Sequence, residues 1–217
     1  KVFVIVLETS SEDIANQMFE TLNNTGKKIA DFYVLKNQLI RSLSEEEVKS
    51  DWDEIEKNLD GISKGKFLVA YVSVFNGKTS EAGAYKAIEK NGKLKDTISA
   101  RETLKELKKA SEAYLYLQTP LARYEHDKVA LNNFYSLVET LMMVSANQYK
   151  TVIVAMELKN YKLAEINQVL KSLLNLHIRN IFISQAPANT LEQFYPSLAQ
   201  SIYKNNICLS VFLCCFK

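Results

Sequence analysis

The chain has 217 residues, of which 47% are hydrophobic and 24% charged, and its formal net charge is +2. These values are typical of a globular protein, and they exclude the strongly basic chains that bind nucleic acid through their charge. No uninterrupted apolar run reaches the length of a membrane span, so we expect no transmembrane segment. The length suits one well-buried domain, and we expect residues 1–217 to form it.

The three cysteines, Cys208, Cys214 and Cys215, all lie in the last ten residues. They do not form a disulfide framework, so we predict a reducing, intracellular compartment. The chain begins at Lys1 and not at Met, which leaves open a targeting or anchor segment before it.

In the first half of the chain, apolar runs alternate with helical patterns. In chain order we predict strand Val2–Leu7, helix Glu12–Asn24, strand Ile29–Leu35, a helix from Ser44 to about Leu59, strand Phe67–Phe75, and helices Ser80–Lys90 and Thr97–Glu112. The segment Ser44-Glu45-Glu46-Glu47 has the spacing of a capping box, which marks the start of its helix.

The second half repeats the alternation. Here we predict strand Ala113–Gln118, helix Arg123–Ala146, strand Thr151–Leu158, helix Leu163–Leu176, strand Asn180–Ser184, helix Thr190–Tyr203 and strand Ile207–Phe216. Repeated strand–helix units predict an α/β fold: a Rossmann-like, three-layer domain with a mostly parallel sheet of about six or seven strands and helices on both faces. A ligand of such a sheet binds beyond the carboxyl ends of its strands.

Tyr124 and Lys128 are four residues apart at the start of a predicted helix. That spacing places both side chains on one helical face, one turn apart. An ammonium beside a phenol stabilises the phenolate, and such a phenol can pass a proton to a carbonyl. The alternative is an ordinary pair on the helix surface.

Together with Val4–Ala15, Phe67–Gly77 and Thr151–Leu158, this pair resembles the short-chain dehydrogenase/reductase family. The resemblance implies an NADP-dependent oxidoreductase in which Tyr124 donates the proton and Lys128 orients the cofactor ribose. It also implies that Thr119 or Ser111 holds the substrate oxygen, and that the cofactor lies against Ser10, Ser11, Lys36 and Asn76.

The turn after the first predicted strand departs from that family. The family has glycines there because its backbone approaches a pyrophosphate closely, whereas this chain has no glycine before Gly26 and carries Glu8 and Glu12. A carboxylate at that place repels a phosphate. Our leading prediction is therefore a degenerate, non-catalytic member: a scaffold or assembly subunit that binds no cofactor, with a protein partner or a homo-oligomer, and no nucleic acid. The active NADP-dependent reductase is the alternative.

A second resemblance is to von Willebrand A-type domains, which bind a divalent cation at the same edge of a similar sheet. The residues that carry it are Glu8, Ser10, Glu12, Thr119 and Glu157. Oxygen ligands from three loops suit Mg²⁺. This reading implies a metal-dependent binding module.

Overall fold

The computed structural model describes residues 30–180 and 192–204, and in these residues it contains helices and no β-strand. The described helices are α2 (Asp31–Ser42), α3 (Glu45–Asn58), α4 (Lys64–Asn76), α5 (Ala84–Lys90), α6 (Thr97–Tyr116), α7 (Lys128–Met143), α8 (Lys150–Leu158), α9 (Leu163–Ile178) and α10 (Phe194–Tyr203), with short 3-10 helices η1 (Glu81–Gly83) and η2 (Pro120–Ala122).

The predicted Rossmann-like α/β fold is therefore wrong. Four predicted strands fall wholly or almost wholly in described residues, and all four are helical: Ile29–Leu35 leads into α2, Phe67–Phe75 lies in α4, Ala113–Gln118 includes the end of α6, and Thr151–Leu158 lies in α8. Residues 30–180 and 192–204 contain no sheet, and so offer no strand ends to hold a dinucleotide or a cation. The resemblances to short-chain dehydrogenases and to von Willebrand A-type domains fail with it, and so do the degenerate scaffold, the active reductase and the metal-dependent module that they implied.

Burial on all sides explains why α4 and α8 look like strands in the sequence. From Phe67 to Phe75 every residue except Val69 is buried, and from Lys150 to Met156 every residue is buried. A helix that is enclosed all round is apolar all round, so it loses the 3.6-residue period and resembles a strand buried on both faces. Val and Ile in these runs strengthened the wrong choice.

The ends of α4 carry the local signals of a helix. The Ser63 hydroxyl accepts a hydrogen bond from the Lys66 backbone N–H at 3.3 Å, which caps the first turn. Gly77 follows the last turn with φ of +81°, a conformation that a glycine adopts without strain. Ser63 and Gly77 therefore mark the two ends of a helix in a segment whose hydrophobic pattern alone was ambiguous.

Three of the amphipathic helices, α3, α6 and α9, were predicted correctly, whereas the amphipathic α2 was predicted as the strand Ile29–Leu35. Helix α3 begins after Ser44, whose hydroxyl accepts from the Glu47 backbone N–H at 3.3 Å. Helices α6 and α9 begin at the predicted residues, Thr97 and Leu163, and each continues past its predicted end. These three helices could be predicted because each has a polar face beside an apolar stripe.

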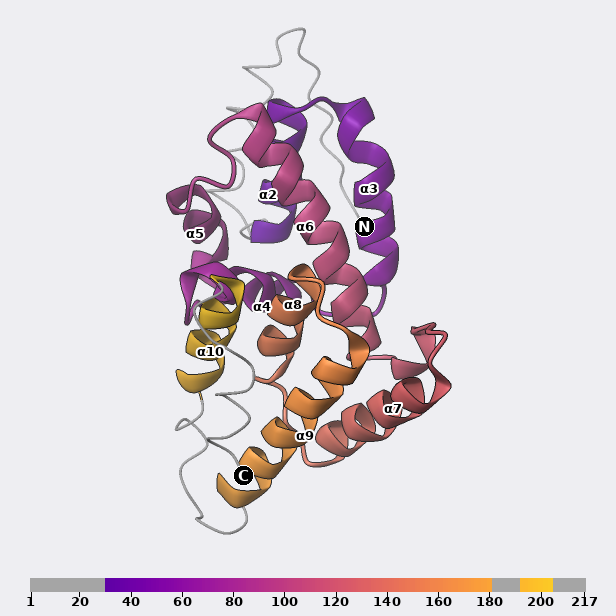
Figure 1. Ribbon diagram of the computed structural model, residues 1–217. Coiled ribbons are helices and arrows are strands. Elements are labelled where there is room, and N and C mark those ends of the chain that lie inside the picture. The colour runs from indigo at the N-terminus through magenta and orange to yellow at the C-terminus, as the bar shows by residue number, and fades with distance from the viewer. Residues whose placement is uncertain (1–29, 181–191, 205–217) are drawn as a thin grey trace, which may run out of the picture.

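Helix α8 is the centre of the packing (Figure 1). It contacts α4, α6 and α10, and also α9. On the far side of α6, α3 packs along that helix, with α2 beside both. Helix α7 pairs mainly with α9, away from α2 and α3 (Figure 1).

A half-buried polar cluster joins α4, α6 and α10. The Glu106 carboxylate accepts hydrogen bonds from the hydroxyls of Tyr71 at 2.9 Å and Tyr203 at 2.5 Å, and from the Lys93 amine at 2.6 Å. Burial, followed by the charge of Glu106, raises the pKa of Tyr71 well above its usual range. The cluster satisfies polar groups that would otherwise be costly to bury, and it holds α10 to the rest of the bundle.

Other predicted elements lie outside the described residues. These are strand Val2–Leu7, helix Glu12–Asn24, strand Ile207–Phe216 with the three cysteines, and all but the first residue of Asn180–Ser184. Among the helices that the structure describes, none is long and apolar enough to span a membrane.

Candidate functional site

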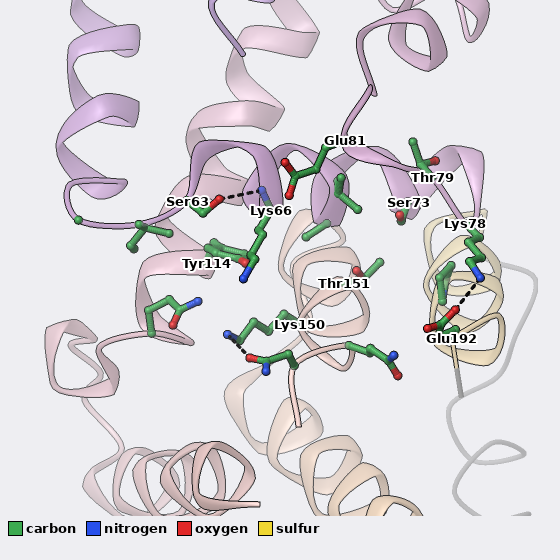
Figure 2. A pocket seen from close by; sticks show the side chains of 18 residues that line it. Ser63, Lys66, Ser73, Lys78, Thr79, Glu81, Tyr114, Lys150, Thr151 and Glu192 are labelled. Atoms are coloured by element: carbon green, nitrogen blue, oxygen red, sulfur yellow. Dashed lines mark hydrogen bonds and ion pairs between the residues drawn. The ribbon is translucent and has the colours of Figure 1, made fainter. Parts of the chain in front are cut away.

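A cavity of about 620 Å³ lies where α4, α6, α8 and α10 meet (Figure 2). Its wall combines the first half of α4 and the loop before it, the end of α6, the start of α8, the loop from Lys78 to Glu81, and Glu192 with Pro196. The volume is in the range of small-molecule sites in proteins. Segments far apart in the sequence build it, so only the tertiary fold creates it.

Lys150 is the most unusual residue of this wall. It is the first residue of α8 and is only 6% exposed. Its amine donates a hydrogen bond to the side-chain oxygen of Asn147 at 3.1 Å and lies 5.6 Å from the centre of the Tyr114 ring. Among the described residues, no carboxylate lies within ion-pair distance of it. A buried lysine is normally neutralised by a carboxylate, and Lys150 is the one buried lysine among the residues that the structure describes.

Burial, and next to it the positive charge of Lys66, lowers the pKa of Lys150 to about 8. The amine therefore exchanges between its charged and neutral forms close to physiological pH. Both effects act in the same direction because each penalises the ammonium form.

Lys66 supplies a second amine to the same part of the cavity. It lies in the first turn of α4 and is exposed, at the rim, and Figure 2 shows its side chain and that of Lys150 directed into the same space. The first turns of α4 and α8 both line the cavity. The amino end of a helix carries a partial positive charge, which adds to that of the two amines and favours an anion.

The opposite end of the cavity is neutralised. There Lys78 and Glu192 form an ion pair at 2.6 Å, which Figure 2 shows away from the two lysine amines. Both side chains are about half exposed. The remaining carboxylate of the wall, Glu81 of η1, is exposed and lies against Gly65 in the first turn of α4, beside Lys66 (Figure 2). Glu81 therefore offsets part of the positive charge at Lys66, while among the described residues no carboxylate lies within ion-pair distance of the Lys150 amine.

Between the two ends the wall is partly apolar, with Ile62, Val69, Ala70 and Pro196. Hydroxyl and amide groups interrupt it, among them Tyr114, Gln118 and Thr151. Burial raises the pKa of the Tyr114 hydroxyl, so this group stays protonated and can donate or accept a hydrogen bond. The arrangement can hold a molecule with an acidic group at one end and a less polar body.

The structure places Tyr124 and Lys128 differently from the prediction. Helix α7 begins at Lys128, because Asp127 caps it by accepting hydrogen bonds from the backbone N–H groups of Val129 and Ala130, both at 3.0 Å. Tyr124 lies before the helix and is 72% exposed, with the Lys128 amine 4.6 Å from the centre of its ring. The two residues do meet, but at the surface, and only Lys128 belongs to a helix, as the first residue of α7.

Ser111 and Thr119, the predicted substrate-oxygen ligands, lie apart from that pair. Ser111 is fully buried in α6, where its hydroxyl accepts from Asn58 at 3.0 Å and donates to the Lys108 carbonyl at 2.7 Å. Thr119 is exposed, directly before η2. The frame that would give these residues their roles is absent.

The other predicted ligands are also dispersed. Lys36 in α2 pairs with Glu56 at 3.7 Å, and Asn76 at the end of α4 donates to the Thr79 hydroxyl at 3.0 Å. Glu157 in α8 pairs with Arg123 at 2.5 Å. Glu8, Ser10, Ser11 and Glu12 lie outside the described residues. Within residues 30–180 and 192–204, no three His, Cys, Asp or Glu side chains gather in a group that could hold a metal ion.

None of these predicted residues that the structure describes lines the cavity, and the sequence analysis missed Lys66 and Lys150 altogether. A signal was present: Lys150 directly precedes the apolar run Thr151–Met156. The prediction assigns that run to a strand, so Lys150 falls in the connection before the strand. Lys150 is buried because the segment is a helix, α8, of which it is the first residue.

Comparisons with models of protein families, with curated proteins and with solved structures found no match to this chain.

Proposed function

We propose that the cavity between α4, α6, α8 and α10 binds a small molecule through an anionic group, a carboxylate or a phosphate. The observation that carries this proposal is the Lys150 amine, which is buried beside a 620 Å³ cavity with an amide oxygen and no carboxylate as its partner. An anionic oxygen in the cavity would supply the missing counter-charge.

Two further features support an anion at this end. Lys66 brings a second amine, and the amino end of α8 adds its partial charge. The apolar side chains of Ile62, Val69 and Pro196 then favour a ligand whose remaining part is not strongly polar. A metabolite-sized acid meets both requirements, and the two ends of the cavity give it one orientation.

Calorimetric titration tests the proposal, with inorganic phosphate and benzoate as the two probes. Phosphate has the anionic group alone, while benzoate joins a carboxylate to an apolar body. The probe that binds with the higher affinity therefore shows whether the site prefers a phosphate or a carboxylate. We expect Lys150→Met and Lys66→Met each to weaken binding by about tenfold or more, as the loss of a charge-assisted hydrogen bond does. Lys150→Arg, which keeps the charge, is expected to retain part of the affinity.

The matched control is Lys105→Met, since Lys105 is an exposed lysine of α6 that does not line the cavity. It should leave the affinity unchanged. Equal affinity in the wild type and in both cavity variants would show that any anion binds elsewhere, and the proposal would fail.

A further inference from the structure

The Lys150 amine has the surroundings of a nucleophile as well as those of an anion ligand. The amine donates a hydrogen bond to the Asn147 amide oxygen, and a neutral acceptor holds the amine in place without requiring its positive charge. Figure 2 shows the amine directed into the cavity, where a ligand can reach it. In a packed core the same amine would have no room to react.

We infer that Lys150 forms a reversible imine with an aldehyde or ketone that also carries an anionic group, and that Lys66 holds that group. The inference rests on the proposed anion binding, because the anionic group is what brings the carbonyl to Lys150 among the many lysines of this chain. It adds the substrate class and a covalent step.

The reaction balances with groups that are present. The lone pair of the neutral Lys150 amine attacks the carbonyl carbon, and the electrons of the carbonyl π bond move to oxygen, forming a carbinolamine. The two protons of the original amine are transferred to that oxygen, which leaves as water when the nitrogen lone pair forms the carbon–nitrogen double bond. No oxidant or reductant is needed.

The charges around Lys150 favour both stages. Burial and the nearby Lys66 maintain a fraction of neutral amine near pH 7, in line with a pKa of about 8. Once the imine has formed, its protonated form is a cation again, and the anionic group of the ligand stabilises it. The hydroxyls of Tyr114 and Thr151, which line the same wall, can hydrogen-bond the carbonyl oxygen or the departing water.

Reductive trapping tests the inference on the whole chain. Wild-type protein is mixed at pH 7 with glyoxylate, an aldehyde with a carboxylate, and sodium borohydride then converts any imine into a stable secondary amine. Peptide mapping by mass spectrometry locates it. We expect Lys150 to be labelled about tenfold faster than the exposed lysines Lys105 and Lys171 of the same molecule, because a nucleophile near its neutral form reacts faster.

Two comparisons separate the parts of the inference. Acetaldehyde has the carbonyl without the anion, so its labelling should favour Lys150 much less than that of glyoxylate does. Lys66→Met should remove most of the preference of glyoxylate for Lys150. Lys150→Arg should abolish labelling at position 150 while it retains part of the phosphate affinity. If that variant does not fold, the rate of Lys150 labelling relative to that of Lys105 and Lys171 in the wild type is a sufficient test.

Labelling of Lys150 no faster than that of Lys105 and Lys171 would overturn the inference, and phosphate binding that is lost in Lys150→Met would still support the proposed function. Fast labelling that is equal for glyoxylate and acetaldehyde and unchanged by Lys66→Met would instead overturn the role of the anion. In that case the proposed function would fail and a merely reactive amine would remain.

Discussion

At the scale of single residues, Lys150 is a stability cost that the cavity explains. A buried ammonium without a carboxylate is unfavourable, and a site that keeps one gives up stability for binding. Replacing such a group by an apolar side chain of similar length removes the penalty. This reasoning leads to a prediction about the free energy of unfolding.

We expect Lys150→Met to stabilise the ligand-free protein at pH 7 by about 1–3 kcal/mol. The pKa of Lys150 is about 8 in the folded state and lies higher in the unfolded chain, so between about pH 8 and pH 10 the unfolded state binds more protons. The wild type therefore gains stability relative to the variant as the pH rises through this window, and below it the difference is constant. Urea unfolding at several pH values measures it.

Lys105→Met is the control for this series as well, because its side chain is exposed and surface substitutions have small effects. A Lys150→Met variant that is less stable than the wild type at pH 7 would mean that the amine has a counter-charge in the folded protein. A difference that does not change between pH 8 and pH 10 would place its pKa outside that range.

At the scale of elements, the chain contains two kinds of helix. Helices such as α3 and α9 have one apolar stripe, and their positions follow from the sequence. Helices α4 and α8 are enclosed, and their periodicity is lost. Their central position explains both observations: it removes the helical period from their sequences, and it places them beside the cavity.

Helix α7 shows how one cap decides a boundary. The sequence pattern placed its start at Arg123, but Asp127 caps the helix and Lys128 begins it. We expect Asp127→Ala to lower the free energy of unfolding by about 1–2 kcal/mol, as the loss of an N-cap does. Asp127→Asn keeps an oxygen that can accept both hydrogen bonds, so it should cost much less; thermal unfolding of the two variants makes the comparison.

Equal losses in the Ala and Asn variants would point to the charge of Asp127 near the helix end, and not to its cap hydrogen bonds. No loss in either would show that the packing of α7 on α9 alone sets the start of the helix.

At the scale of the whole molecule, α8 links the helices, since it contacts α4, α6, α9 and α10. We therefore keep the prediction of one domain and expect one cooperative unfolding transition. The single tryptophan, Trp52, is fully buried in α3, while Leu170 is fully buried in α9. Leu170→Ala should cost about 3 kcal/mol, and the transitions followed by Trp52 fluorescence and by far-UV circular dichroism should shift together.

If Leu170→Ala moves the circular dichroism transition and leaves that of Trp52 in place, α7 and α9 unfold separately from the rest, and the chain has two cooperative units. A conservative Leu170→Met substitution, which keeps most of the volume, should leave both transitions nearly unchanged.

The large exposed side chains at the two ends of α7, Val129 at 73% and Met143 at 82%, are compatible with the expected protein partner or homo-oligomer. Nothing in the described residues covers them, so the partner stays a prediction, as does the reducing compartment.

The sequence by itself determined the ordinary globular composition and the amphipathic helices α3, α6 and α9, because a 3.6-residue stripe is a local property. The fold class and the cavity were decided only by the tertiary structure. An apolar run such as Phe67–Phe75 or Thr151–Leu158 fits a buried strand or an enclosed helix equally well, and its neighbours choose between them. Lys66 and Lys150 are 84 positions apart in the numbering, and they share one cavity only because α4 and α8 pack side by side.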